Sequence, residues 1–220
     1  TKTQPTKNTK IGVRKAPAPE GRPGFIRIDS VHQGDLDGVK GLYHINAVDC
    51  VTQWQVVASV QAISEAHLLS VIEEMLAQFP FEILGFHADN GSEYVNHKVA
   101  RLLEKLRIEF TRSRPRHSND NGLAETKNGA VVRKEFGYEH IHRRHAARFD
   151  TYCREYLNPF LNFHRPCLFA TELADPKKPG RIKRVYRPRD AMTPLDKLAS
   201  LPNAASFLRP GVTLLELQQL

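Results

Sequence analysis

The sequence predicts an α/β fold in which helices flank a mixed sheet of five strands. Three consecutive runs rich in Val, Ile, Tyr and Trp lie between residues 24 and 60, as is typical of an antiparallel meander. Beyond them, stretches with apolar residues at helical spacing alternate with short apolar runs. This alternation favours helices that cover the sheet and later strands that run parallel to one another.

The meander is expected at about residues 24–31, 41–52 and 54–60. Its first strand carries Asp29. Asp49, in the second run, is a rival functional acid, but its place in that run favours a turn or salt-bridge role instead.

Two helices and two strands follow the meander. The first helix is expected from Ser64, a suitable N-cap, to about Gln78, and Pro80 ends it. After the next strand, a second helix at about residues 96–106 leads into a short strand at 108–111. Three antiparallel strands followed by alternating helices and parallel strands is the order of the ribonuclease H-like fold.

A carboxylate at the end of a strand marks the candidate functional site. Asp89 ends an apolar run that contains Ile83, Leu84 and Phe86, and the turn dipeptide Asn90-Gly91 follows it at once. The acid is therefore expected to be exposed at the carboxyl end of its strand.

Two further acids accompany Asp89 in the sequence. Asp29 closes another apolar run, and Glu125 follows Asp89 with 35 residues between them. Glu125 is expected on a helix, where it shares a face with Asn128 three residues later. A lone helical Glu is ordinarily a solvated surface residue, and Asp120 is the nearest substitute, although it precedes the helix.

These acids and their neighbours resemble the integrase core shared by retroviral integrases and bacterial insertion-sequence transposases. Residues 89–94, Asp-Asn-Gly-Ser-Glu-Tyr, resemble the aspartate motif of that family. Residues 121–125, Asn-Gly-Leu-Ala-Glu, together with Asn128 resemble its glutamate motif, including the glycine three residues before the acid and the asparagine three after. Residues 162–166, Asn-Phe-His-Arg-Pro, resemble the signature that follows the core in bacterial members, and the resemblance covers roughly residues 24–170.

The resemblance implies a metal-dependent polynucleotidyl transferase, a DNA transposase or integrase. Its reactions would be cleavage at transposon ends and joining of the freed 3′-hydroxyl to target DNA. Asp29, Asp89 and Glu125 would be the catalytic residues and the ligands of two Mg²⁺ or Mn²⁺ ions, because these ions prefer hard oxygen ligands. No Ser-His-Asp arrangement, P-loop or dinucleotide fingerprint competes with this assignment.

The charge of the chain indicates an acidic partner. A net charge of +8 and a pI near 9.5 are more typical of nucleic-acid binding than of membrane binding in a soluble protein. Cations flank Glu125 on a polar loop and on the helix after it, where they would contact phosphates. The expected DNA-binding residues are Arg112, Arg114, Arg116, Lys127, Asn128 and Lys134.

The expected partners follow from the proposed reaction. They are the transposon ends and the target DNA, together with further copies of the chain. Joining two ends to one target needs at least two active sites held together, so a homo-oligomer, a dimer or larger, is expected on DNA.

Composition divides the chain into three parts. Residues 1–23 carry cations and prolines with hardly any apolar periodicity and are expected to be a basic flexible arm. Residues 24–165 would form the catalytic core, and residues 166–220 a basic C-terminal extension. Within the extension, Thr193 is expected to be the N-cap of a helix, with Asp196 at its third position.

The remaining features indicate a soluble protein of the bacterial cytoplasm, associated with DNA and without a membrane partner. No apolar run approaches the roughly 18 residues that a membrane span requires. The three cysteines form neither a disulfide framework nor a recognised zinc site. Because the chain begins with Thr1 rather than Met, we expect a fragment of a longer protein.

Two alternative functions remain open. A ribonuclease H-like nuclease would share the metal ions, but such nucleases normally lack the glycine-to-glutamate motif at this spacing. A non-catalytic DNA-binding remnant of a transposase would keep the basic surface while losing an acid, and all three acids are present here.

Overall fold

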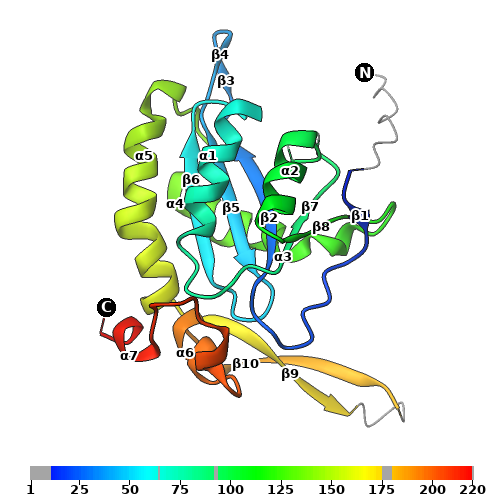
Figure 1. Cartoon of the computed structure of the whole chain (residues 1–220). Helices are drawn as coiled ribbons and strands as arrows, with labels where there is room; N and C mark the ends of the chain where they lie inside the picture. Colours follow the sequence, from blue (N-terminus) through cyan, green and yellow to red (C-terminus); the bar gives the residue numbers. More distant parts are fainter. Residues whose placement is uncertain (1–10, 64, 92–93, 175–179, 220) are drawn as a thin grey trace.

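A mixed sheet with helices on both of its faces forms the body of the molecule (Figure 1). The computed structural model describes residues 11–63, 65–91, 94–174 and 180–219. The expected N-cap Ser64 and part of the aspartate motif, Ser92 and Glu93, lie outside these ranges. The six strands lie in the order β1 (Val13–Arg14), β8 (Glu109–Arg112), β7 (Gly85–Ala88), β2 (Phe25–His32), β5 (Tyr43–Asp49) and β6 (Gln55–Val60).

The strand directions confirm the predicted α/β order. β2, β5 and β6 form an antiparallel meander, and β7 runs parallel to β2 and to β8. The predicted count of five strands is wrong, because Val13–Arg14 adds a sixth strand that runs parallel to β8. The backbone of Lys15 prolongs this pairing by donating to the carbonyl of Arg112 (3.3 Å). The edge of β8 thus gains a partner from a segment whose sequence shows no strand pattern.

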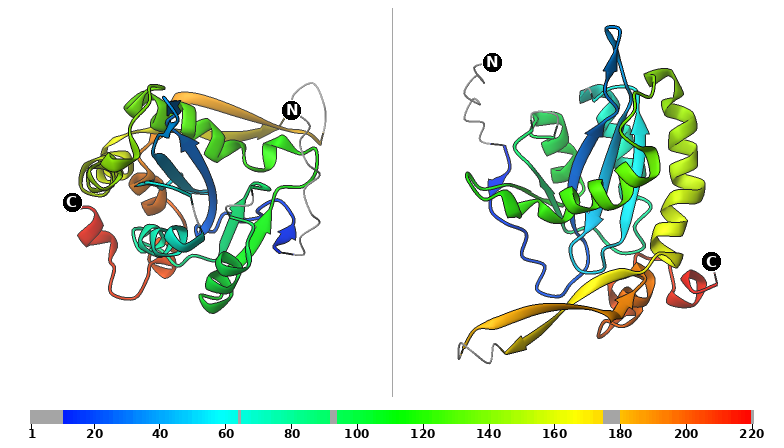
Figure 2. Two further views of the ribbon diagram at one scale, coloured as in Figure 1. Left: turned by 90° about the horizontal axis from the view of Figure 1, so that it is seen from above. Right: turned by 180° about the vertical axis from the view of Figure 1, so that it is seen from behind.

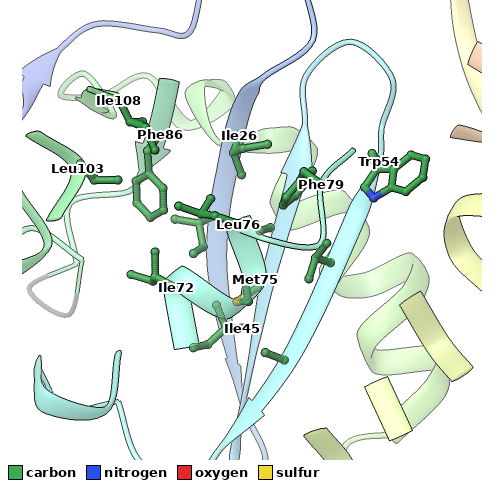
Figure 3. Close-up of a cluster of buried hydrophobic side chains, with 14 of the residues drawn as sticks. Ile26, Ile45, Trp54, Ile72, Met75, Leu76, Phe79, Phe86, Leu103 and Ile108 are labelled. Atoms are coloured by element: carbon green, nitrogen blue, oxygen red, sulfur yellow. The ribbon is translucent and has the colours of Figure 1, made fainter. Parts of the chain in front are cut away.

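The main apolar core lies between the sheet and two helices, α1 (Glu65–Leu76) and α2 (His97–Lys105). Figure 3 shows Ile72 and Leu76 of α1 directed toward Ile26 of β2 and Phe86 of β7. This confirms the expectation that helices with apolar residues at helical spacing cover the sheet. Because side chains alternate along a strand, Ile26 on this face places Arg27 and Asp29 on the opposite one.

The opposite face is covered by two longer helical segments (Figure 2). The first consists of α3 (Gly122–Lys127), a π-helical turn (Asn128–Val132) and α4 (Arg133–Phe136). The second begins with α5 (Ala146–Tyr152) and continues through π-helical turns to residue 164. Both segments contribute to a second, smaller apolar cluster, which consists of Val31, Val57, Val131, Val132, Cys153, Leu157 and Leu161.

The edge strand β6 is capped by side chains of the second segment. Asn162 accepts from the backbone N–H of Gln55 and donates to its carbonyl, both at 2.8 Å. Asn158 does the same at Val57, at 2.8 and 3.0 Å. These amides occupy the positions that the backbone of a further strand would take, so the edge does not offer free groups for pairing with another chain.

The C-terminal part forms a hairpin and a small helical cap. β9 (Cys167–Ala174) and β10 (Ile182–Met192) pair antiparallel and project from the body (Figure 1). α6 (Pro194–Ala199) and α7 (Leu214–Leu217) return to the main core. The predicted helix start at Thr193 is confirmed, because its hydroxyl accepts from the N–H of Asp196 at 3.0 Å.

Two smaller features complete the fold. β3 (Asp35–Leu36) and β4 (Val39–Lys40) form a short hairpin at the top of the view in Figure 1. Over the ranges that the structure describes, no helix combines the length and apolarity needed to cross a membrane.

A buried histidine beside the second cluster predicts a fold that is sensitive to acid. His44 of β5 is fully buried, its Nδ1 lies 2.9 Å from the hydroxyl of Ser59, and its ring stacks on Phe136. Burial lowers the pKa of His44 from 6.5 to about 3. Between these values the unfolded chain binds a proton that the folded chain does not, so stability is lost as the pH falls below about 6.5.

We therefore expect the Tm to fall between pH 7 and pH 4.5, and His44→Leu to remove part of that fall. His97→Gln, at an exposed histidine of α2, serves as the control and should leave the pH dependence unchanged. Thermal unfolding followed by circular dichroism across this range checks the expectation. Parallel curves for His44→Leu and the parent chain would contradict it.

Candidate active site

Two adjacent parallel strands bring Asp29 and Asp89 together. Ile28 of β2 and Ala88 of β7 are register partners, and each is followed directly by one of the two acids. β7 ends at Ala88, and the carboxylate of Asp89 accepts from the N–H of Gly91 at 2.8 Å. The turn predicted after Asp89 is thus confirmed, and the carboxylate itself stabilises it.

Helix α3 carries the third acid and is fixed to the sheet by amide side chains. Asn121 donates to the carbonyl of Ile28 at 3.1 Å, and Asn46 of β5 donates to the carbonyl of Ala124 at 3.2 Å. Glu125 lies in the first turn of this helix and is exposed. Two hydrogen bonds from buried amides therefore determine where Glu125 stands relative to the strands.

A chain of three amides leads to Asp29. Asn128 donates to Asp29 Oδ2 at 2.7 Å, Asn46 donates to Asn128 Oδ1 at 2.9 Å, and Gln55 donates to Asn46 Oδ1 at 2.9 Å. Because an ionised carboxylate can only accept hydrogen bonds, Asn128 must turn its NH₂ group toward Asp29. That choice fixes the orientation of Asn46 and then of Gln55.

The surroundings of Asp29 disfavour the charged form of its carboxyl group. Burial first, and then the charges of Asp89 and Glu125, raise its pKa from 3.8 to about 6, against hydrogen bonds from Ser30 and Asn128 that lower it. The other two predicted acids therefore both act electrically on Asp29. Such repulsion between carboxylates is what a bound cation relieves.

The donor set fits a hard divalent ion in its chemistry. Carboxylate oxygens are the ligands that Mg²⁺ and Mn²⁺ prefer, and Asp29 on β2, Asp89 after β7 and Glu125 on α3 supply them. In the conformation that the structure describes, no three His, Cys, Asp or Glu side chains of the described ranges are gathered closely enough to hold an ion. The assignment of these acids as metal ligands stays a prediction.

The loop before α3 is organised by an internal ion pair. Both Nε and Nη2 of Arg114 donate to the carboxylate of Asp120, at 2.9 and 2.8 Å. This contact holds the pKa of Asp120 well below its usual range. Asp120 is therefore occupied within its own loop, whereas Arg116, at the tip, is exposed.

The other cations of the predicted DNA contact differ in exposure. Arg112 is buried at the end of β8, and Lys127 is buried with its ammonium 3.0 Å from the thiol of Cys167. Lys134 lies exposed on α4. Their contact with phosphates, like that of Asn128, stays a prediction.

Asp49 has the turn role that the sequence favoured. It is fully buried, and its carboxylate accepts from the N–H groups of Gly24 (2.8 Å) and Thr52 (2.7 Å). With its oxygens engaged in this way, Asp49 does not compete for the candidate site.

Two amides behind Asp29 were not predicted from the sequence. Asn46 is the cross-strand partner of Asp29, and it interrupts the apolar run of β5 between Ile45 and Ala47. A polar side chain within a buried strand requires a partner, which is the signal that could have found it. Gln55 offers a weaker signal, because it begins its strand.

Part of the chain matches a known protein family. Residues 22–118 match the family model described as the integrase core domain. This segment is thus similar to an integrase core domain. The matched segment contains Asp29 and Asp89 and ends before Glu125.

The fold of the chain is similar to that of a solved viral protein. A chain of the simian T-cell lymphotropic virus intasome, solved in complex with the PP2A regulatory subunit B56 gamma, matches with a TM-score of 0.51 and 15% identity, over 74% of this chain and 56% of that one. The catalytic core domain of BIV integrase gives a TM-score of 0.45 and 15% identity, over 64% and 85% of the two chains. The predicted ribonuclease H-like fold is confirmed.

A bacterial protein is also similar to part of the chain. The uncharacterized protein y4rM of Sinorhizobium fredii (strain NBRC 101917 / NGR234) is 30% identical over 117 residues, which are 53% of this chain and 33% of that protein. The chain therefore spans about a third of the length of this curated relative.

The amide chain yields a prediction for Asn128→Ala. The change removes one hydrogen-bond partner from Asn46 and one from Asp29 in a largely buried place, so the free energy of unfolding should fall by about 1–3 kcal/mol. Urea unfolding of the parent and the variant measures the loss. Lys134→Ala, at an exposed position of the same helical segment, should change stability by less than about 0.5 kcal/mol. Equal losses in the two variants would contradict the importance of the chain.

Proposed function

We propose that this chain is the catalytic domain of a DNA transposase or integrase, which cleaves phosphodiesters and joins a 3′-hydroxyl to target DNA with the help of divalent metal ions. The observation that carries the proposal is that the charges of Asp89 and Glu125 both act on Asp29, in a chain whose residues 22–118 match the integrase core family model. Asp29 and Asp89 follow register partners on adjacent strands, and Glu125 acts electrostatically on Asp29 from α3. This combination supports the proposed chemistry more strongly than the acids would singly.

The side chains of the site would have distinct roles in the reaction. When bound, two Mg²⁺ or Mn²⁺ ions would activate the attacking oxygen and stabilise the leaving 3′-oxygen. Each oxygen of Asp29 accepts one hydrogen bond, Oδ1 from Ser30 and Oδ2 from Asn128, and keeps a second lone pair for a ligand. Asp29 is thus oriented by fixed donors, which suits the most central of the three ligands.

The working form would be a dimer or larger assembly on DNA. Paired joining needs two active sites held together, and the simian viral chain of similar fold belongs to an intasome. We also assign the protein to the bacterial cytoplasm; the similarity to a bacterial protein agrees with a bacterial origin. Within the chain, we assign residues 24–165 to the catalytic core, residues 1–23 to a basic arm and residues 166–220 to a basic extension.

The acids provide the central test. Asp29→Asn, Asp89→Asn and Glu125→Gln should each abolish metal-dependent strand transfer while leaving DNA binding largely intact, because each removes a ligand that acts on the transition state. A loss of about 4 kcal/mol of stabilisation corresponds to roughly a thousandfold in rate. A strand-transfer assay with labelled transposon-end DNA and Mg²⁺ or Mn²⁺ measures the effect, using the longer protein that contains this domain.

Glu104→Gln, at an exposed position of α2, is the control and should keep full activity. Near-normal joining by any of the three acid variants would remove that residue from the ligand set. Cleavage without joining by the parent would favour the nuclease alternative, and DNA binding without metal-dependent chemistry would favour the non-catalytic remnant.

The exposed cations beside Glu125 provide a second test. The double change Arg116→Gln with Lys134→Gln should weaken duplex DNA binding and reduce the slope of log affinity against log salt by about 0.9 for each phosphate that is no longer neutralised. The matched control is Arg101→Gln with Lys105→Gln on α2, which covers the opposite face of the sheet. Anisotropy titrations at several salt concentrations measure both quantities. Identical slopes in the two double variants would mean that these cations are an ordinary solvated surface.

A further inference from the structure

A groove of about 810 Å³ runs between helix α3 and the base of the β9–β10 hairpin. Figure 2, in the view from behind, shows α3 above this hairpin. One face of the helix lines the groove, at residues 122, 123, 126, 127 and 130. The remaining lining residues include Arg27 of β2, the turn at residues 50–53 and the start of β9.

The charge of the groove is positive and largely uncompensated. Arg27, Lys127, Arg165 and Arg184 line it, and no Asp or Glu does. Among the described residues, only Arg184 of these four has a carboxylate partner, Glu172 at 3.1 Å. Cationic groups that are withdrawn from water without a counter-charge are costly, so the groove favours an anionic ligand.

One of these cations is buried, and another has a buried donor atom. Lys127 is 6% exposed, and its ammonium donates to Cys167 rather than to an acid. The Nε of Arg27 is buried and has no hydrogen-bond partner. Buried donors without a partner are rare in folded proteins, and a ligand oxygen would satisfy this one.

The walls between the cations are apolar and aromatic. Leu123 and Pro166 line the groove together with Tyr186 of β10, which is 59% exposed. An exposed aromatic ring among cations suits single-stranded nucleic acid, because unpaired bases stack on the ring while the phosphates meet the charges. A duplex gains little from such a ring, since its own base pairs already cover the base faces.

The groove is built into the fold and leads to the candidate site. Lys127 holds the base of the hairpin through Cys167, and Gln53 holds it by donating to the carbonyl of Leu168 at 2.9 Å. Arg27 and Asp29 are two residues apart on β2 and therefore face the same side. The groove therefore lies on the face of the sheet that carries Asp29.

We propose that this groove binds a single-stranded segment of nucleic acid, with its phosphates at the four cations and a base on Tyr186. The assignment of this segment to the DNA strand on which the acids would act rests on the proposed function. The binding itself does not depend on catalysis, and it is tested separately.

The test uses fluorescence anisotropy on the 220-residue chain. Three probes of about ten nucleotides are compared: oligothymidylate, an abasic chain of the same length, and a duplex. We expect oligothymidylate to bind most tightly. Tyr186→Ala should weaken that binding by roughly a factor of ten and leave the other two probes unaffected, whereas Tyr186→Trp should keep it. Tyr156→Ala, at an exposed tyrosine of the α5 segment, is the matched control.

The cations are tested in the same way. Arg165→Gln and Arg184→Gln should each weaken oligothymidylate and the abasic chain alike, with a salt slope smaller by about 0.7 for one phosphate that is no longer neutralised. Arg148→Gln, exposed on α5, is their control. Arg165 also donates to the carbonyl of Ala130, so the Tm of its variant is measured, and Arg184 provides the second, exposed position.

Three results would overturn the proposal: equal affinity for duplex and oligothymidylate, no effect of Tyr186→Ala, or competition by polyglutamate as effective as that by oligothymidylate. Asp29→Asn should bind oligothymidylate at least as tightly as the parent does. Failure of strand transfer with intact groove binding would therefore count against the proposed function alone, and the reverse result would count against the groove alone.

Discussion

The hydrogen bond from Asn128 to Asp29 joins the sheet to the helix that carries Glu125. Behind it, Asn46 and Gln55 extend the amide chain across β5 and β6, so three adjacent strands and one helix share a single network. Each member has its orientation fixed by the next, and an unpaired buried amide would cost about 1–3 kcal/mol. The network thus holds the carboxylate of Asp29 in one orientation, although burial helps to raise the pKa of this acid to about 6.

The π-helical turns occur where one helical segment makes a polar contact and also contributes side chains to an apolar cluster. The first π-helical turn begins at Asn128, which bonds Asp29, and it ends with Val131 and Val132 in the second cluster. In the other segment, Asn158 and Asn162 cap β6 while the neighbouring Leu157 and Leu161 join that cluster. π-helical turns are often found at functional sites, and here they lie beside the candidate site and along the sheet edge.

The local pattern of the sequence predicted the meander, the apolar stripe of α1, the turn after Asp89 and the cap at Thr193, because each depends on residues close in the chain. The sixth strand was missed, since two residues form a strand only through pairing with β8. The burial of Lys127 was missed for a similar reason. Its position on a helix near Glu125 suggested an exposed cation, but the base of the hairpin, 40 residues later, covers it.

Net charge alone does not tell which cations are available to a ligand. Arg114 is paired with Asp120, whereas Arg27, Lys127 and Arg165 have no carboxylate partner among the described residues and line one groove. This positive groove adjoins Asp29, whose pKa the charges of Asp89 and Glu125 help to raise. A phosphodiester led along the groove would be attracted by its walls and then repelled by the acids. A divalent ion removes that repulsion, so under the proposed function ion and strand must each favour the binding of the other, because coupling between two ligands is reciprocal.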